Sequence, residues 1–434
     1  MSTASSMPKP WAVLAYTVAD DKSGSSELDA AAKRELRAIC EAADFGQVNV
    51  AAQVDFKHTR GIWRGLLTEK PTLRVTKVAP TPDDDDDDHP LWRNIVGSIK
   101  RSLVRGVAEK VELNAARADV LQDFLRFGQR GCPADRYVVT FYGHAYGPMG
   151  LFFDADARQR TASTLRLNDL ASSIEGIEGK AAVVIFRDCF MNTLETAYQL
   201  RRAAEFMLAS QSVVPVAGVW PWLQFMTALM PSAVSGDVGR ALAVQLAHFL
   251  DEPSNRGPFE DVPYSLIDLE ETETVVKPLK ALVSGLEAVR TDAKRAAACA
   301  KALEASRIGY PDDHSNPGDP ALLDVPTMCD KLSAVDADAV AGPARALGEA
   351  VRERLVRWHH SQKKAYQGIS LYYQPVKPHD IERSFIMSGN AEDAAKDAEY
   401  YAQLALCEAT GWHRIALNPL RKASAAGTAR GSAS

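Results

Sequence analysis

Short apolar runs alternate with amphipathic segments along the first half of this 434-residue chain, and this alternation restricts its fold more than any other feature. Strands are predicted at residues 11–18, 48–54, 137–144 and 183–186, and helices at 27–43, 114–128, 165–174 and 190–200. Residues 73–78 alternate in polarity, which suits an edge strand or a hairpin arm. Connections of crossover length imply a mostly parallel sheet that is covered on both faces. The predicted fold class is therefore α/β, a three-layer α/β/α sandwich.

The second half of the chain is more helical, with helical periodicity at residues 238–250, 275–305 and 340–358. A further strand is expected at residues 368–373. We expect one unit at residues 1–230, a helical C-terminal region at 231–420 that completes the fold, and a disordered tail at 421–434, which is rich in Ala, Ser and Gly.

The composition excludes several classes of partner. Hydrophobic residues make up 46% and charged residues 24% of the chain, which predicts a packed globular protein. The net charge of −6 argues against a nucleic-acid partner. No apolar run approaches the roughly 18 residues of a membrane span, so no membrane partner is expected. The first residues lack the basic and apolar regions of a signal peptide, and we therefore expect a cytoplasmic protein.

The six cysteines are scattered, and none forms a C-x-x-C pair, so the sequence gives little support to a zinc site or a thioredoxin-like site. Scattered spacing in a cytoplasmic chain predicts free thiols. Cys40, Cys299 and Cys407 fall inside helical patterns, where a cysteine is usually a small buried residue. The surroundings of Cys189 are different.

Cys189 follows the predicted strand at 183–186 and stands at the start of the predicted helix at 190–200. Unpaired amides and the helix dipole at such a position favour the thiolate, so we expect a lowered thiol pKa. His144 ends another predicted strand, inside the glycine-rich segment 142–150. Adjacent parallel strands would deliver both side chains to one sheet edge, where nucleophilic thiol chemistry becomes feasible. A buried structural role for either residue is the alternative that the local sequence leaves open.

A run of six aspartates, Asp83 to Asp88, stands between Pro82 and Pro90. Six like charges in a row predict a solvated acidic loop near residues 79–91, within a long insertion. A calcium-attracting patch, an inhibitory segment and a processing site are the functional alternatives.

Several ordered segments resemble the clostripain family of caspase-like cysteine peptidases, which have the caspase–haemoglobinase fold. The resemblance covers most of the chain and lies in residues 11–16, 48–55, 133–144, 189–200, 210–222, 263–269 and 368–373. The segment 189–200, which begins with Cys-Phe-Met-Asn-Thr-Leu-Glu, is similar to the family's nucleophile helix. The segment that leads to His144 resembles the approach to the family's catalytic histidine.

The resemblance implies a caspase-like fold and peptide hydrolysis through an acyl-enzyme. Cys189 would be the nucleophile and His144 the general base and acid. The backbone amides of Cys189 and Ala145 are candidates for the oxyanion donors, although the family usually has glycine where Ala145 stands. The chemistry compels no third acidic residue and requires no metal, though calcium dependence is known in the family.

The chain departs from its family just before the nucleophile, where it reads Arg187-Asp188-Cys189 instead of the usual Asp-Ala-Cys. Side chains alternate along a strand, so Arg187 points toward the substrate with Cys189, while Asp188 points away. In the family, the acidic residue at the position of Arg187 helps to bind a basic P1 side chain, the one before the scissile bond. A second acidic residue usually precedes Trp-Pro, where this chain has Ala217.

Arg187 could hold a substrate carboxylate, so we hypothesise a preference for Asp or Glu at P1. Two alternatives stay open: Arg187 pairs with a nearby carboxylate and leaves a neutral pocket, or a carboxylate from another loop preserves a preference for Arg or Lys. Arg158 and Arg160 are candidate processing sites, because family members can cleave themselves after a basic residue in this loop.

The sequence therefore predicts a regulatory cysteine endopeptidase that is made as a precursor and acts on protein or peptide substrates. Such an enzyme would suit a bacterial proteolytic or defence cascade, with an upstream activating protease or an inhibitor protein as partner. The alternative from another class is an inactive pseudopeptidase scaffold, whose Arg187-Asp188 turn recognises an acidic partner.

Overall fold

The computed structural model describes residues 8–19, 27–43, 47–56, 62–67, 114–152, 164–178, 180–216, 220, 222, 225–227, 238–251, 261–309, 318–377, 380–381, 384, 386 and 391–420. The main sheet consists of β1 (Lys9–Val18), β2 (Val48–Asp55), β3 (Ile62–Leu67), β4 (Ala134–Tyr142), β5 (Ala181–Phe186), β6 (Ala204–Ser210), β7 (Tyr264–Asp268) and β9 (Val356–His359). Its eight strands have the order β3-β2-β1-β4-β5-β6-β7-β9. The five central strands β2, β1, β4, β5 and β6 are parallel to their neighbours in this group. Strand β3 at one end, and β7 and β9 at the other, pair antiparallel.

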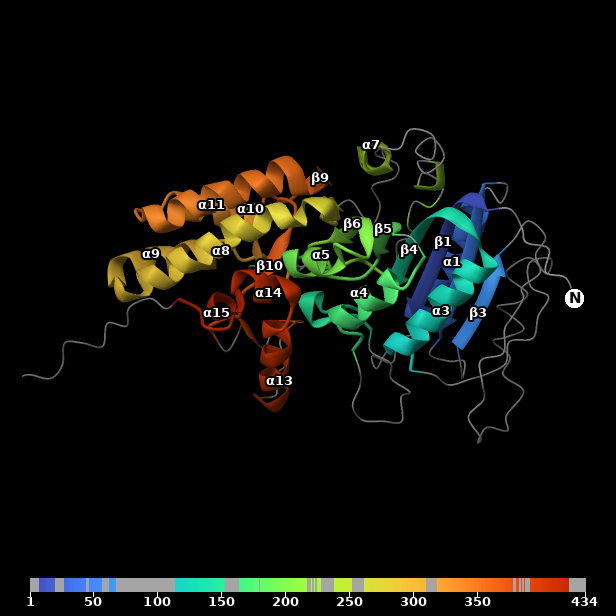
Figure 1. Ribbon diagram of the computed structural model, residues 1–434, viewed down its shortest axis with the longest axis horizontal. Helices are drawn as coiled ribbons and strands as arrows, with labels where there is room; N and C mark the ends of the chain where they lie inside the picture. The colour runs from blue at the N-terminus through green and yellow to red at the C-terminus, as the bar shows by residue number, and fades with distance from the viewer. Residues whose placement is uncertain are drawn as a thin grey trace, which may run out of the picture.

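Helices cover both faces of this sheet (Figure 1). One face packs against α3 (Ala118–Gly131), α4 (Leu167–Glu175) and α5 (Leu194–Leu200), and the other packs against α1 (Glu27–Ala42) and α7 (Val238–Asp251). Successive residues of β1 enter opposite cores: Leu14 lies in the first, and Val13 and Ala15 lie in the second. A strand that is buried on both faces reads as a continuous apolar run, as β1 does. The three-layer α/β/α sandwich with a mostly parallel sheet is thereby confirmed.

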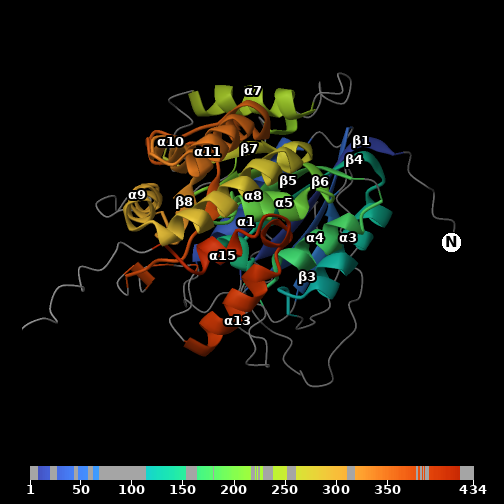
Figure 2. The ribbon, with the colours of Figure 1, turned by 60° about the vertical axis from the view of Figure 1, so that its left-hand side comes forward.

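The C-terminal part is mainly helical and extends the first core. Its helices are α8 (Glu273–Ala288), α9 (Ala293–Glu304), α10 (Val325–Ser333), α11 (Asp338–Ala350), α13 (Ala391–Ala402), α14 (Ala405–Thr410) and α15 (His413–Ala416). Shorter turns of helix are η1 (Gly147–Met149), η4 (Leu269–Thr272), η5 (Val289–Thr291) and the π-helical η6 (Val351–Leu355). Helices α8 to α11 lie at the left of Figure 1, far from β1 and β3, and Figure 2 shows α7 and α13 on opposite sides of the molecule.

The strand expected at 368–373 is present as β10 (Ser370–Tyr372), but it pairs with β8 (Leu322–Asp324) in a separate two-stranded antiparallel sheet. A single parallel bridge between Thr193 and Ser370 links it to the segment that precedes α5. The second half of the chain also supplies β7 and β9 to the main sheet. The predicted boundary near residue 230 stays a prediction.

Two helix predictions are corrected by the structure. The segment 275–305 holds two helices: α8 ends at Ala288, and after η5 Asp292 caps α9 by accepting hydrogen bonds from Lys294 N and Arg295 N, both at 3.1 Å. The segment predicted as helical to residue 358 leaves the helix after η6, and Val356 and Trp358 belong to β9 instead. The free edge of β7 offers a ladder of backbone partners, and these tertiary hydrogen bonds override the local helical pattern.

Several predicted features lie outside the described residues. These are the strand at 73–78, the aspartate run, Arg158, Arg160, Ala217 and the tail at 421–434. The sheet edge at β3 was not predicted.

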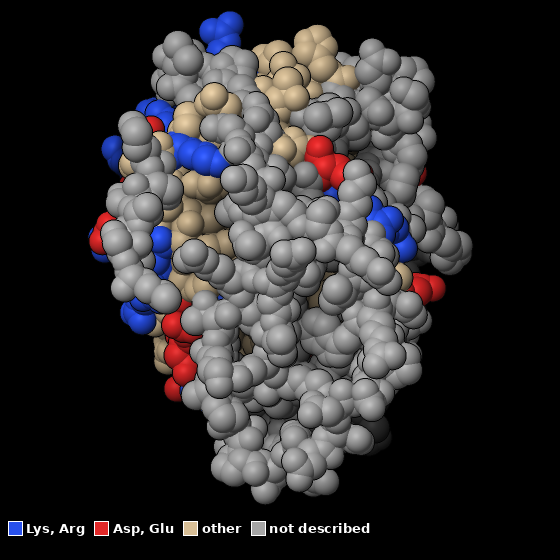
Figure 3. All heavy atoms as spheres, turned by 90° about the vertical axis from the view of Figure 1, so that its right-hand side faces the viewer, with Lys and Arg blue, Asp and Glu red and all other residues tan. Residues whose placement is uncertain are grey.

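The described surface carries charges of both signs. In the view of Figure 3, basic and acidic side chains of the described residues are interspersed with uncharged ones, and they form no stripe of a single sign. None of the helices that the structure describes has the length and apolar character needed to cross a membrane.

Candidate active site

The parallel pairing of β4 and β5 brings the two predicted catalytic residues to one edge of the sheet. Phe141 is paired with Phe186, and Arg187 N continues the ladder with a 2.9 Å hydrogen bond to Phe141 O. His144 stands three residues beyond Phe141, and Cys189 stands three residues beyond Phe186. The two residues therefore have matching positions past the carboxyl ends of neighbouring strands, where ligands of parallel sheets bind.

The backbone after His144 folds into a tight turn. Phe152 N donates to His144 O at 2.8 Å, and Tyr146 N donates to Gly150 O at 2.9 Å. Gly150 has φ of 119°, and a Cβ there would meet Leu165 O at 2.4 Å, so this position requires glycine. These bonds fix the peptide that links His144 to Ala145.

Two amides at this edge remain open to an acceptor. Among the residues that the structure describes, neither Cys189 N–H nor Ala145 N–H has a hydrogen-bond acceptor, whereas the neighbouring amides of Phe190 and Tyr146 do. The alanine in place of the family's glycine keeps the amide, because only the side chain differs. Two backbone donors without a hydrogen-bond acceptor among the described residues thus stand beyond the strands that lead to His144 and Cys189, and their oxyanion role stays a prediction.

Cys189 lies in a turn, not in the first turn of a helix. Phe190 has φ of +59°, and the amides of Phe190 and Asn192 donate to Ser212 O and Ser210 O at 3.1 and 3.0 Å. Helix α5 begins only at Leu194. The helix prediction therefore began four residues too early.

The expected lowering of the thiol pKa is wrong for this structure. Cys189 is partly exposed as a residue, but burial of its sulfur raises the pKa of Cys189 to about 11. The amide of Val214, which donates to Sγ at 3.3 Å, acts in the opposite direction, and the Asp188 carboxyl adds to the increase. The helix dipole acts mainly within the first turn, which Cys189 does not reach, so desolvation prevails.

The raised pKa predicts how the resting thiol reacts with pH. Alkylation of Cys189 by iodoacetamide should accelerate about tenfold per pH unit between pH 7 and pH 10, because only the thiolate reacts. The measurement is the initial rate of adduct formation at Cys189 by mass spectrometry, with Cys189→Ala to subtract labelling of other thiols. A rate that levels off below pH 8 would instead indicate a preformed thiolate.

Arg187 does not present an open positive charge. Its side chain is 0% exposed, and its Nη1 donates to Glu35 Oε1 of α1 at 2.6 Å. The guanidinium carbon also lies 5.3 Å from the ring centroids of both Tyr142 and Trp220. Of the alternatives open at the sequence level, the pairing of Arg187 with a nearby carboxylate is the one found here. The guanidinium is therefore not open to a substrate carboxylate, and a P1 preference for Asp or Glu finds no support in this pairing.

Sequence reasoning missed Glu35. Its side chain is charged, yet it is only 4% exposed and lies among apolar residues on the buried stripe of α1. It accepts further hydrogen bonds from Trp222 Nε1 at 2.7 Å and Trp220 N at 3.3 Å. The signal was an acidic residue beside Leu36 on a stripe that should be buried, because a buried charge requires a partner.

Asp188 is fully buried, and its predicted direction away from the substrate stays a prediction. Burial raises the pKa of Asp188 well above its usual range, while the Arg187 guanidinium and the Gly143 amide act in the opposite direction. Burial thus favours the protonated carboxyl in the folded protein.

Replacing this carboxyl by an amide should stabilise the fold at neutral pH. The raised folded-state pKa means that, above the unfolded-state pKa of about 4, unfolding releases a proton and stability falls as pH rises. Asp188→Asn removes this penalty and should raise the unfolding free energy at pH 7 by on the order of 1 kcal/mol or more, since one pKa unit is worth about 1.4 kcal/mol. Urea unfolding at pH 7 and pH 3.5 measures this, and an equal gain at both pH values would refute the ionic explanation.

No metal site is formed near this edge by the part of the chain that the structure describes, which holds no cluster of three or more His, Cys, Asp or Glu side chains with metal-site geometry. Calcium binding stays a prediction without an assigned set of ligands.

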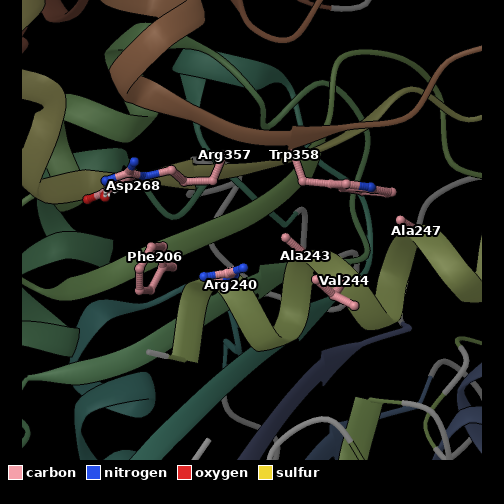
Figure 4. A pocket seen from close by; sticks show the side chains of 8 residues that line it. All are labelled: Phe206, Arg240, Ala243, Val244, Ala247, Asp268, Arg357 and Trp358. Carbon is pink, nitrogen blue, oxygen red and sulfur yellow. Dashed lines mark hydrogen bonds and ion pairs between the residues drawn. The ribbon is translucent and has the colours of Figure 1, made fainter. Parts of the chain in front are cut away.

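A cavity of about 470 Å³ lies elsewhere, between α7 and strands β6, β7 and β9 (Figure 4). Arg357 crosses its wall toward Asp268, and both Nε and Nη2 donate to Asp268 Oδ2, at 2.9 and 2.6 Å. Arg240 and Trp358 also line it. Its charged groups have both signs, and none of the predicted site residues belongs to it.

One comparison with known proteins identifies a family. The sequence model described as the clostripain family matches residues 100–318, just over half of the chain. No curated protein matches the sequence.

Two solved structures share the fold. A secreted C11 cysteine protease from Bacteroides thetaiotaomicron, in complex with an irreversible peptide inhibitor, is 16% identical with a TM-score of 0.57. An inactive zymogen C11 protease from Parabacteroides distasonis is 17% identical with a TM-score of 0.59. Each alignment covers 93% of this chain and 99% of the other. The family model, together with this shared fold, shows that the chain belongs to the clostripain family of cysteine peptidases.

Proposed function

We propose that this cysteine peptidase hydrolyses peptide bonds through a Cys189–His144 dyad. The observation that carries the proposal is the matched position of the two residues, each three beyond a paired residue of adjacent parallel strands. A nucleophile and its base must lie within reach of each other, and this register gives them the same edge.

The reaction begins with a neutral thiol, because burial raises the pKa of Cys189. His144 takes the thiol proton as the sulfur attacks the substrate carbonyl, and the amides of Cys189 and Ala145 donate to the developing oxyanion. His144 then gives its proton to the leaving amine as the acyl-enzyme forms. Water, activated by His144, attacks the thioester and releases the second product together with the free thiol.

A thiol-directed peptide probe tests the proposal. A peptide with a reactive ketone at its carboxyl end should label the intact protein, and Cys189→Ala should abolish the label. Labelling of neither protein, under conditions in which a known cysteine peptidase reacts, would favour the pseudopeptidase scaffold instead.

Activation by cleavage is part of the proposal. The raised pKa of Cys189 suits a precursor in which the thiol is not yet poised for attack. Arg158 and Arg160 remain the proposed processing positions, and an upstream protease with basic preference would cut there. Fragments that still form with Cys189→Ala in the presence of trypsin, but not in its absence, would support cleavage by another enzyme.

A further inference from the structure

Arg187 stands two residues before Cys189, and the buried Glu35 pairs with it, so the two charges balance. We infer that the P1 pocket is electrically neutral and accepts an uncharged side chain, and that Glu35 of α1 sets this charge. The inference rests on the proposed function of Cys189, since a P1 pocket exists only if Cys189 cuts peptides.

A short chain of contacts links this pair to the Cys189 sulfur. Val214 N donates to Cys189 Sγ at 3.3 Å, and two residues further Val216 O accepts a 3.5 Å hydrogen bond from Tyr142 Oη. The Tyr142 ring is one of the two rings against the Arg187 guanidinium. The segment that touches the sulfur is therefore connected directly to the residues that hold Arg187.

The other side of the guanidinium is also occupied. The Trp220 ring lies against Arg187 and meets the buried Tyr264 ring edge-on, with centroids 5.0 Å apart. Trp220 N donates to Glu35 Oε2. Trp220 thus contacts the Arg187 guanidinium, the Glu35 carboxylate and the Tyr264 ring.

The charges of Arg187 and Glu35 cancel at the position that we assign to the P1 pocket. Arg187 and Glu35 form one buried ion pair, and Glu35 also receives the Trp222 indole N–H. A substrate carboxylate would have to displace Glu35 from the guanidinium, and a substrate cation would have to displace Arg187 from the carboxylate. Either exchange leaves a buried charge without its partner, which costs far more than an uncharged side chain does.

The lining that remains is apolar or aromatic, from Val214, Tyr142, Trp220 and Tyr264. Discrimination against both charge signs is then a form of specificity by exclusion. The family's acidic residue at the position of Arg187 would give one net negative charge, whereas this chain has none.

The test compares peptides that differ only at P1, with Asp, Glu, Arg, Lys, Gln and Leu, on the intact or trypsin-activated protein. Peptides with Gln or Leu should be cleaved with kcat/KM at least about tenfold higher than the four charged ones, a ratio that corresponds to roughly 1.4 kcal/mol. A preference for either charge sign in the wild type would overturn the inference.

Variants then change the net charge one step at a time. Glu35→Gln keeps the shape of the side chain and should raise cleavage after Asp relative to Arg by about tenfold or more. Arg187→Met removes the positive member of the pair and leaves the Glu35 charge, so it should shift the ratio by a similar factor toward Arg or Lys. The double variant is neutral again and should return to uncharged peptides.

The control is Glu304→Gln, which makes the same change beside a buried arginine, because Arg307 pairs with Glu304 at 2.8 Å in the C-terminal region. Its P1 profile should match that of the wild type. An unchanged profile in Glu35→Gln, with the double variant also unchanged, would overturn the role of Glu35. Absence of both hydrolysis and Cys189 labelling would overturn the proposed function, and with it the inference, so the two failures are distinguishable.

Discussion

Cys189→Ala should lower peptide hydrolysis by roughly 10⁴- to 10⁶-fold, the range seen when a peptidase loses its nucleophile or base. The other cysteines that the structure describes with their side chains, Cys132, Cys299, Cys329 and Cys407, are buried in the cores, so none of them can take over the attack. The measurement is kcat/KM with the best peptide of the P1 series. His144→Ala should cause a loss of similar size.

The two losses should not add. A dyad acts as one unit, so the double variant should be no slower than the slower single variant within about threefold. Cys299→Ala serves as the matched control, because it removes a free thiol from α9 and should leave kcat/KM unchanged. Activity within tenfold of wild type in Cys189→Ala would exclude Cys189 as the nucleophile.

The sheet could be read from the sequence because its strands are buried on both faces. Residues 11–18 and 183–186 are nearly all apolar, and such runs between helical stripes admit few other folds. The edge strand β3 contains Arg64 and Gly65, so it lacked this signal. Strand β9 also lacks a continuous apolar run, and its local pattern is helical. Its strand conformation comes from its pairing with β7.

The placement of Cys189 and His144 beyond neighbouring strands was predictable for a topological reason. Adjacent parallel strands end on the same side, so the order of β4 and β5 decides the position of both residues. The thiol pKa was not predictable, because it depends on a turn at Phe190 that separates Cys189 from α5 and on the burial of the sulfur.

The partner of Arg187 could not be found along the chain. Glu35 is 152 positions away along the chain, on α1, the helix that connects β1 to β2. The alternation of side chains along a strand predicts the side to which Arg187 points, but its partner on that side, Glu35, is brought there by tertiary packing. The same limit applies to Trp220 and Trp222, which reach Glu35 from a segment of no regular periodicity.

Breaking this ion pair should have the largest effect on stability of any single change near the site. Arg187→Met should lower the free energy of unfolding by about 3–5 kcal/mol, because Glu35 would keep a buried charge without its counter-ion. Glu35→Gln should cost less, since the amide can still accept the indole N–H of Trp222 and the two rings still face the guanidinium. Unfolding in guanidinium chloride at pH 7 measures both.

The double variant, Glu35→Gln with Arg187→Met, decides whether charge pairing or shape is responsible. If charge pairing dominates, the second substitution removes the stranded charge, and the double variant should be more stable than Arg187→Met alone, by about 1–3 kcal/mol of coupling energy. If packing around the two tryptophans dominates, the single losses should simply add. Additive losses would therefore mean that the ion pair contributes little to stability beyond the volume that it fills. Such a result is physically reasonable, because replacing a buried ion pair by apolar groups of similar size is often close to neutral. The neutral pocket would then have to be explained by the aromatic side chains around the pair.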